Sequence, residues 1–203
     1  MIRLYTTPFF IRMLYPSLVW KMPDDGKKIY LTFDDGPHPI ITVKVLELLK
    51  KYNAKATFFC VGNNVKVNKE VVEKIREDGH SIGNHTFNHE KGWITNTDDY
   101  IKSVEETRTL VNSVLLRPPH GRIRFSQLRK LKKHYKIIAW TVISYDWDKN
   151  LTADDCYRIV INKAGNGSIV VFHDSEKAEK NMLPALEKVL EYYTNKGYSF
   201  ERL

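Results

Sequence analysis

Short apolar runs alternate with amphipathic segments along most of the chain. The runs are rich in Val, Ile and Phe, as buried strands are, and the segments between them place apolar residues at helical spacing. The predicted strands cover residues 29–33, 56–61, 81–84, 114–117, 136–142, 168–172 and 198–201. The predicted helices cover residues 42–52, 69–78, 98–114, 125–134, 153–164 and 183–194.

This alternation predicts an α/β fold around a largely parallel sheet. Seven such strands form either an open doubly wound sheet or an incomplete barrel, and periodicity does not distinguish the two. Both architectures place functional loops at the carboxyl ends of the strands. No repeat or low-complexity linker divides the chain. We therefore expect a single domain over residues 29–203, with an N-terminal extension, residues 1–28, packed on it.

The N-terminal extension is apolar and aromatic but lacks the features of an export signal. Arg12 and Pro16 interrupt its apolar stretch, and no small-residue cleavage site follows. No run in the chain reaches the ~18 apolar residues of a membrane-spanning helix. We therefore expect a cytoplasmic protein with no transmembrane segment, and the sequence leaves the oligomeric state open.

The net charge narrows the choice of partners only slightly. The 203 residues include 32 Lys and Arg against 24 Asp and Glu, a formal net charge of +8. Such a charge suits an acidic polymer or a membrane surface. The basic residues are nevertheless spread along the chain, without an RNA-binding aromatic motif or zinc-finger spacing. We expect no nucleic-acid partner.

Two adjacent carboxylates, Asp34 and Asp35, follow the first predicted strand on a Gly-Pro turn. Asp-Asp-Gly-Pro is also an ordinary turn sequence, so the pair alone does not indicate a function. Adjacent carboxylates repel unless a positive group lies beside them. A metal bound by one carboxylate, with the other handling protons, would resolve that repulsion.

Two histidines, His85 and His89, follow the third predicted strand. We expect their spacing to place both imidazoles on one face of a helical turn, where they can bind one metal ion. A pair with this spacing also arises by chance in a chain with seven histidines. Two histidines and one carboxylate leave positions open for water or substrate, which suits hydrolysis better than a structural metal site.

Three further strand ends carry residues of catalytic type. Arg117 begins a rigid Pro-Pro loop that contains His120. Asp146 and Trp147 follow the fifth predicted strand, and His173 follows the sixth. A single histidine or a Pro-rich turn at a strand end is usually structural. Five strand ends of this kind predict one active site at that edge of the sheet.

These motifs closely resemble those of the polysaccharide deacetylase family, the nodulation-factor deacetylase homology domain of carbohydrate esterase family 4. Five motifs occur in the family's order over residues 29–203: Thr-Phe-Asp-Asp-Gly-Pro at 32–37, His-Thr-x-x-His at 85–89, Arg-x-Pro-x-Gly at 117–121, Asp-Trp at 146–147 and an apolar residue two before His at 171–173. The family fold is a distorted (β/α)7 barrel. The resemblance therefore favours the barrel over the open sheet.

The resemblance also implies catalytic roles. Asp35, His85 and His89 are similar to the family's ligands for one divalent metal ion, usually Zn²⁺, with Co²⁺ or Ni²⁺ as substitutes. Asp34 matches the general base that takes a proton as water attacks the amide carbonyl. The other matches complete the set: His173 as the acid that protonates the leaving amine, Asp146 as the residue that orients it, and Arg117 as the residue that orients the base and keeps it ionised.

Three residues are implied to contact the substrate. The backbone N–H of His120 would stabilise the oxyanion, and Trp147 and Val171 resemble the apolar walls around the acetyl methyl group. This chain has Ile143 where many members have an aspartate, and His120 where an aromatic residue is common. These departures leave the catalytic set intact and affect only the contacts to the substrate.

The resulting expectation is a metal-dependent deacetylase that releases acetate from N-acetylated amino sugars of a chitooligosaccharide- or peptidoglycan-type glycan. The same site could cleave O-acetyl esters of xylan-like glycans. A non-catalytic glycan-binding protein of the same fold is an alternative, which the complete residue set disfavours. A phosphoesterase or nuclease is another, although such sites often hold two metals and more carboxylates.

Overall fold

Strand β1 (Lys28–Asp34) lies between β2 and β7 in a parallel sheet in the computed structural model, which describes residues 4–203. The other strands are β2 (Ala56–Cys60), β3 (Ser81–Asn84), β4 (Leu115–Leu116), β5 (Lys136–Ile137), β6 (Val142–Ile143), β7 (Ser168–His173) and β8 (Ser199–Phe200). Their order is β5–β4–β3–β2–β1–β7–β6, and β8 pairs with the first residues of β1. Residues 1–3 of the predicted N-terminal extension lie outside the described residues.

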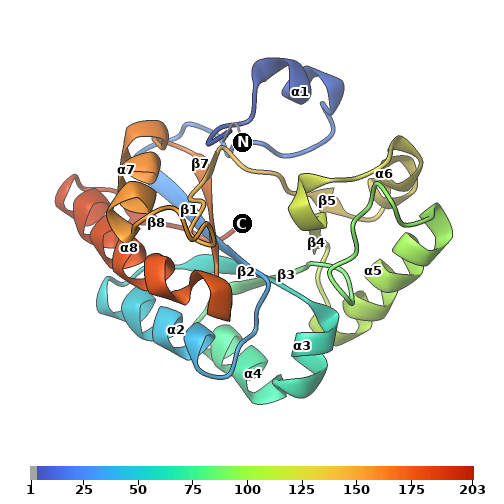
Figure 1. Ribbon diagram of the computed structural model, residues 1–203, viewed down its shortest axis with the longest axis horizontal. Coiled ribbons are helices and arrows are strands. Elements are labelled where there is room, and N and C mark those ends of the chain that lie inside the picture. The colour runs from blue at the N-terminus through green and yellow to red at the C-terminus, as the bar shows by residue number, and fades with distance from the viewer. Residues whose placement is uncertain (1–3) are drawn as a thin grey trace.

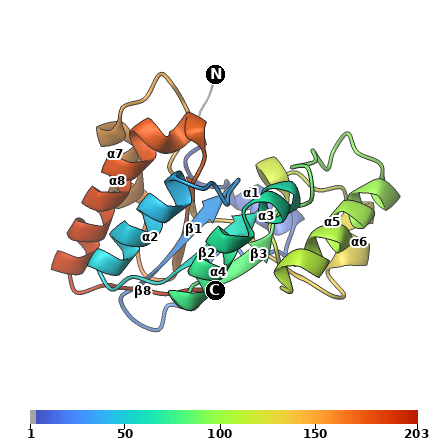
Figure 2. The ribbon, with the colours of Figure 1, turned by 90° about the horizontal axis from the view of Figure 1, so that it is seen from below.

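Helices surround this curled sheet, as Figures 1 and 2 show. They are α1 (Phe9–Leu14), α2 (Ile41–Lys51), α3 (Gly62–Val67), α4 (Lys69–Glu77), α5 (Thr97–Val111), α6 (Phe125–Leu131), α7 (Ala153–Lys163) and α8 (Glu176–Asn195), with a 3₁₀ turn, η1, at Pro119–Gly121. In Figure 1, α7 and α8 lie on one side of the ring, α5 and α6 on the other, and α1 projects at the top. A parallel sheet curled inside helices confirms the distorted barrel expected from the resemblance.

Side chains on one face of the sheet pack against the helices, and side chains on the other face point to the inside of the barrel. Ile29, Leu31 and Phe33 belong to the largest apolar core, which includes buried residues of α2, α4 and α8. Successive side chains of a strand point to opposite faces. Tyr30 therefore packs in a separate apolar cluster inside the curl of the sheet. Asp34 ends the strand on that same inner face, at the carboxyl end.

The barrel is open between β5 and β6, and the prediction of one strand over residues 136–142 is wrong. β5 pairs with β4, whereas β6 pairs with β7 at the opposite end of the sheet. The chain leaves the sheet between them, where the Arg117 guanidinium donates hydrogen bonds to the carbonyl oxygens of Ile138 and Ala139. One apolar run therefore supplies both edges of the opening.

The N-terminal segment fills this opening. Val19 forms a parallel bridge with Ile138, and Thr6 forms an antiparallel bridge with Val142. Helix α1 lies between these two bridges in sequence, and none of its residues is buried. The division of the chain at residue 28 into an extension and a catalytic domain stays a prediction.

The helices differ from the predictions at three places. α1 and α3 occupy segments without a predicted helix, and α8 begins at Glu176 instead of residue 183. Pro184 lies inside α8, and the buried apolar stripe continues on both sides of it, through Ala178 and Met182 before it and Leu186 after it. Burial of this stripe outweighs the local cost of the proline.

Candidate active site

The predicted site residues meet at the carboxyl ends of β1, β3, β4, β6 and β7, around a cavity of about 720 Å³. Seven of them line the cavity: Asp34, Asp35, His85, His89, His120, Trp147 and His173. Arg117 and Asp146 are completely buried and support the lining residues from below. Val171 is completely buried in β7 and does not line the cavity.

The segment from His85 to His89 is a loop, so the predicted helical turn is wrong. Thr86 and His89 adopt left-handed backbone conformations, with φ of 63° and 58°. The side chain of Asn84 accepts a hydrogen bond from the N–H of Thr86 at 2.9 Å and fixes the start of the loop. The two imidazoles still converge, with ring centroids 5.0 Å apart.

Asp35, His85 and His89 form a set of groups that fits one metal ion. Their candidate ligand atoms all lie within 4.8 Å of one another. Asp35 Oδ1 is 3.2 Å from His89 Nε2 and 3.9 Å from His85 Nε2. His85 Nδ1 donates to the carbonyl oxygen of Arg117 at 2.8 Å, which leaves Nε2 as the free nitrogen facing Asp35. One carboxylate and two imidazoles are the ligand types of a catalytic zinc site with open positions.

The electrostatics of the site keep His85 and Asp35 in the forms that bind a metal. Burial lowers the pKa of His85 to about 4, against the opposing charge of Asp34, so the ring is neutral at pH 7. Burial alone would raise the pKa of Asp35, but the hydrogen bond from His89 and the nearby His173 and His85 hold it well below its usual value. Neutral imidazoles and an ionised carboxylate are the forms that ligate a metal.

Lys177 is a site residue that the sequence analysis missed. Its Nζ lies 2.9 Å from Asp35 Oδ2, on the side of the carboxylate away from His89. Lys177 stands on the first turn of α8, in a segment that was not predicted to be helical. A lysine at this position carries no motif signal, so only the packing of α8 against the site reveals it.

Asp34 is paired with a buried arginine. Arg117 Nη1 donates to Asp34 Oδ1 and to Thr32 Oγ1, each at 2.7 Å. The guanidinium also packs 4.1 Å from the centre of the Phe59 ring. Burial lowers the pKa of Arg117 and the charge of Asp34 opposes that change; an arginine stays protonated even so. The carboxylate is thus held in one orientation by a fixed positive charge.

Asp146 and His173 form a second pair beside the first, since His173 on β7 is the register partner of Asp34 on β1. His173 Nδ1 donates to Asp146 Oδ1 at 2.8 Å, and the His173 backbone N–H donates to Oδ2 at 2.7 Å. Burial would lower the pKa of His173, but the charge and hydrogen bond of Asp146 raise it to about 9. The Trp147 ring lies 4.5 Å from the imidazole, nearly perpendicular to it. His173 is therefore a protonated imidazole with Nε2 free to face the cavity.

His120 lines the cavity next to the candidate metal ligands. Its backbone is left-handed, with φ of 58°, inside η1. Its ring centroid is 4.7 Å from that of His89, and burial lowers the pKa of His120 to about 4. The neighbouring Gly121 also has a positive φ, and a Cβ there would collide with the Trp140 ring. This loop therefore has a defined shape beside the candidate metal ligands.

Asp174 anchors the loop that carries the two aspartates, a role that the sequence analysis did not assign. Its buried carboxylate accepts hydrogen bonds from Thr42 Oγ1 and from the Gly36 N–H, the latter at 3.1 Å. A Cβ at position 36 would overlap this carboxylate, so only glycine fits there. The backbone N–H of Asp174 also donates to the carbonyl of Asp34 at 3.2 Å.

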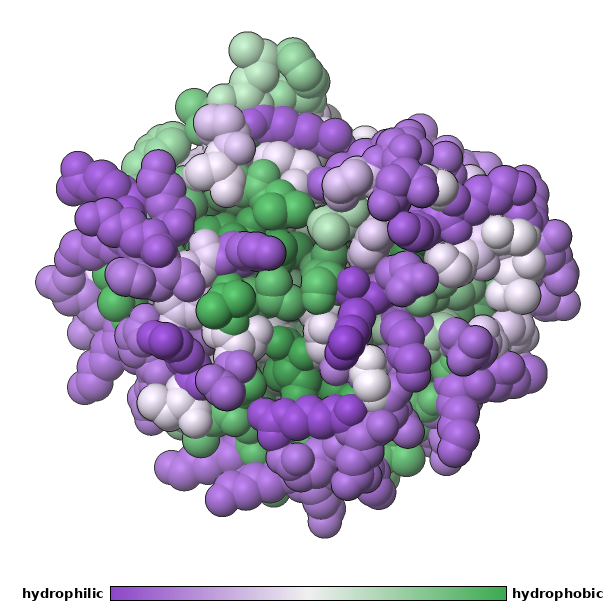
Figure 3. Space-filling model, turned by 180° about the vertical axis from the view of Figure 1, so that it is seen from behind, coloured by the Kyte–Doolittle hydropathy of each residue, from purple (hydrophilic) through white to green (hydrophobic). Residues whose placement is uncertain are grey.

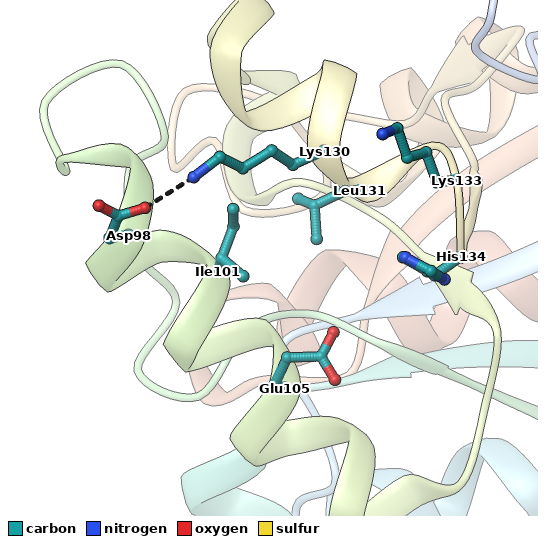
Figure 4. Close-up of a pocket in the computed structure, with 7 residues that line it drawn as sticks. All are labelled: Asp98, Ile101, Glu105, Lys130, Leu131, Lys133 and His134. Atoms are coloured by element: carbon teal, nitrogen blue, oxygen red, sulfur yellow. Dashed lines mark hydrogen bonds and ion pairs between the residues drawn. The ribbon is translucent and has the colours of Figure 1, made fainter.

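The three remaining histidines, His38, His80 and His134, do not line this cavity. His38 Nδ1 accepts the N–H groups at the start of α2, and His80 Nδ1 accepts the N–H of Ala56 at 3.2 Å. His134 lines a separate hollow of about 400 Å³ between α5 and α6 (Figure 4). That hollow is bordered by the Asp98–Lys130 ion pair and contains none of the predicted site residues.

Comparison with known families gives a match over more than half of the chain. Residues 21–138 match the model of the polysaccharide deacetylase family. A peptidoglycan-N-acetylglucosamine deacetylase of Bacillus cereus is 33% identical over 189 residues, which cover 89% of this chain and 68% of that protein.

Solved structures resemble the whole fold. The Bc1960 peptidoglycan N-acetylglucosamine deacetylase superposes with a TM-score of 0.89 and 31% identity, over 97% of this chain and 95% of that one. A family 4 acetyl xylan esterase from Clostridium thermocellum, solved in complex with a cobalt ion, has a TM-score of 0.78 and 29% identity, over 87% of this chain and 88% of that one.

Proposed function

The chain belongs to the polysaccharide deacetylase family, and from that premise we propose that it removes N-acetyl groups from the amino sugars of a peptidoglycan- or chitooligosaccharide-type glycan. One observation carries the proposal. A three-residue metal-binding set, a carboxylate–arginine pair and a carboxylate–imidazolium pair surround the same cavity. Amide hydrolysis needs an activated water, a base and an acid, and this arrangement supplies a group for each.

Asp35, His85 and His89 would hold the divalent metal ion. Zn²⁺ suits one carboxylate and two imidazoles, and Co²⁺ or Ni²⁺ accepts the same ligands. When bound, the ion supplies Lewis acidity towards the amide carbonyl and lowers the pKa of a bound water. Lys177 contacts Asp35 Oδ2, whereas His89 contacts Asp35 Oδ1. The lysine therefore compensates the negative charge of Asp35 and leaves Oδ1 available to the metal ion.

Asp34 takes the proton from the attacking water. It stands next to Asp35 in sequence and lines the same cavity, and Arg117 holds Oδ1 so that the other carboxylate oxygen is directed to the reaction centre. The backbone N–H of His120 stabilises the negative charge that develops on the carbonyl oxygen. Trp147 borders the space for the acetyl methyl group, with the buried Val171 behind the wall.

His173 delivers a proton to the leaving amine. Asp146 keeps the imidazole charged and aimed by binding both its Nδ1–H and its backbone N–H. An amine leaves poorly unless it is protonated, whereas an alcohol leaves from an ester with less assistance. A fully formed imidazolium at this position therefore favours N-acetyl over O-acetyl substrates.

The decisive experiment measures acetate release from N-acetylglucosamine oligomers, peptidoglycan fragments and acetylated xylan. The enzyme is assayed as purified, after chelation, and after Zn²⁺ or Co²⁺ is restored. We expect release from the N-acetylated glycans that chelation abolishes and metal restores. Release from xylan alone would show an O-acetyl esterase, and silence on every substrate with metal bound would refute the proposal.

A further inference from the structure

The N-terminal helix α1 presents an apolar surface to solvent. Four of its six residues are large, apolar and mostly exposed: Phe9 75%, Phe10 68%, Met13 66% and Leu14 57%. Leu4, shortly before the helix, is 51% exposed. In Figure 3 the projection at the top of the molecule is correspondingly green. A contiguous apolar patch of this kind on a protein surface marks a contact site.

A second element extends this surface. Tyr15, which directly follows α1, stacks on Phe125 at the start of α6, with ring centroids 4.9 Å apart and nearly parallel planes. Phe125 is itself 56% exposed. We refer to α1 together with Leu4 and Phe125 as the apolar rim. It borders the catalytic cavity, because Pro8, Ile11 and Tyr15 line that cavity.

Basic residues flank the apolar rim. The segment 122–133 contains six Lys and Arg and no acidic residue: Arg122, Arg124, Arg129, Lys130, Lys132 and Lys133. Arg122 lies over the Trp93 ring, 5.0 Å from its centre, and Arg124 donates to the Trp93 carbonyl oxygen. These contacts hold both guanidinium groups at the surface without neutralising their charge. Lys130 is paired with Asp98 of α5 at 2.8 Å, so the rim combines exposed Phe, Met and Leu with the positive charge of the other five residues.

Exposed apolar side chains and positive charge together favour one kind of binding partner for the apolar rim. An acidic polymer would match the charge but would leave the phenylalanines in water. A second copy of the chain would bury the apolar side chains but would bring two basic segments and two net charges of +8 together. An anionic lipid bilayer satisfies both features, since its acyl boundary accepts apolar side chains and its headgroups attract arginine.

We propose that the apolar rim docks on an anionic lipid bilayer, with α1 lying in the headgroup region. Within residues 4–203, no helix has the length and apolar content to cross a bilayer, so the contact is interfacial. Docking through the rim would bring the mouth of the catalytic cavity next to the membrane surface.

The test is sedimentation of the whole protein with vesicles of phosphatidylcholine alone and with a quarter phosphatidylglycerol. We expect binding to the anionic vesicles, reduced by raising NaCl from about 0.1 M to about 0.5 M because salt screens the headgroup charge. The double variant Phe9→Ser/Phe10→Ser should lower the partition coefficient roughly tenfold or more. Arg129→Gln should lower it by a few fold, because one charge near the surface is lost.

Matched controls separate the rim from the rest of the surface. Val67→Ser changes an apolar residue that is 76% exposed on α3, and Lys180→Gln removes an exposed charge on α8. Both variants should bind vesicles as the wild type does. Absence of binding to anionic vesicles, or equal binding by the Phe9→Ser/Phe10→Ser variant, would overturn the proposal. A lipid-free dimer that this double variant dissociates would overturn it as well, by showing a second copy on the rim.

Discussion

Arg117 Nη1 donates a 2.7 Å hydrogen bond to Asp34 Oδ1 across 83 positions of sequence. The arginine side chain is completely buried, and Asp34 exposes only 4% of its surface. The guanidinium also donates to the carbonyl oxygens of Ile138 and Ala139, at the point where the chain leaves the sheet. One residue therefore orients the proposed base and shapes the open edge of the barrel.

Asp34→Asn should abolish turnover while leaving the metal site intact. The amide cannot accept a proton from water, and Asp35, His85 and His89 are unchanged. We expect kcat to fall by roughly 10²–10⁴-fold, with one metal ion per chain still measured by elemental analysis. His85→Ala is the matched variant, because it should lose both metal and activity. Retained turnover in Asp34→Asn would contradict the assignment of the base.

Arg117→Lys should destabilise the fold and slow the reaction although it keeps the charge. A single ammonium group cannot reach Thr32, Asp34 and two carbonyl oxygens together, so buried acceptors lose their partners. We expect the free energy of unfolding to drop by about 2 kcal/mol or more in urea denaturation. Arg129→Lys, on the exposed face of α6, should change it by less than about 0.5 kcal/mol. Equal effects of the two substitutions would argue against the buried network.

His173→Ala should impair amide substrates more than activated esters. The leaving amine needs a proton from the imidazolium, whereas an aryl oxide leaves without one. We expect kcat/KM for an N-acetylated oligosaccharide to fall roughly 10²-fold or more, and for an aryl acetate much less. The comparison uses the same metal-loaded preparation for both substrates. Equal losses on both would show that His173 serves binding or folding instead of proton delivery.

Asp174→Asn should change how stability depends on pH. Burial raises the pKa of the Asp174 carboxyl from 3.8 to about 7, against hydrogen bonds from Thr42 and the Gly36 N–H. Between these two values the folded protein holds a proton that the unfolded chain releases. The contribution of this group to stability is therefore present below about pH 4 and is lost as the pH rises through about 7.

The variant removes this titration but keeps the shape of the side chain. Relative to the wild type, Asp174→Asn should gain stability as the pH rises from about 4 to about 7, by at most about 1.4 kcal/mol per pH unit. Urea denaturation across this range, in chelator so that no metal contributes, measures the difference. Parallel profiles for the two proteins would show that Asp174 does not titrate there.

Much of the fold was predictable because its signals are local. Buried parallel strands such as β2 and β7 are continuous apolar runs, and helices such as α2 and α7 show a periodic apolar face. The prediction was wrong where tertiary contacts decide. The run 136–142 looks like one strand, yet the Arg117 guanidinium binds its carbonyl groups and Val19 pairs with its edge.

The candidate active site was likewise predictable where short motifs mark it, and unpredictable where tertiary contacts shape it. Asp35, His85 and His89 belong to motifs at strand ends, and so do the Asp34–Arg117 and Asp146–His173 pairs. Their convergence could therefore be expected from a parallel sheet. The helical turn expected at residues 85–89 was wrong, because Asn84 and two left-handed residues shape that loop. Lys177 contacts the aspartate loop from the first turn of α8, which the sequence pattern places outside a helix, and Asp174 contacts it from the turn between β7 and α8.

The sequence by itself determined the parallel α/β architecture, the family and the residues that gather at the carboxyl ends of the strands. These follow from periodicity and from motifs a few residues long. Only the tertiary structure decided which strand edges stay open, how the N-terminal segment fills the opening, and that Lys177 and Asp174 hold the loop of the two aspartates. Such contacts join residues as much as 141 positions apart and more, as between Leu4 and Tyr145, and they depend on the packing of the whole chain, which no local pattern encodes.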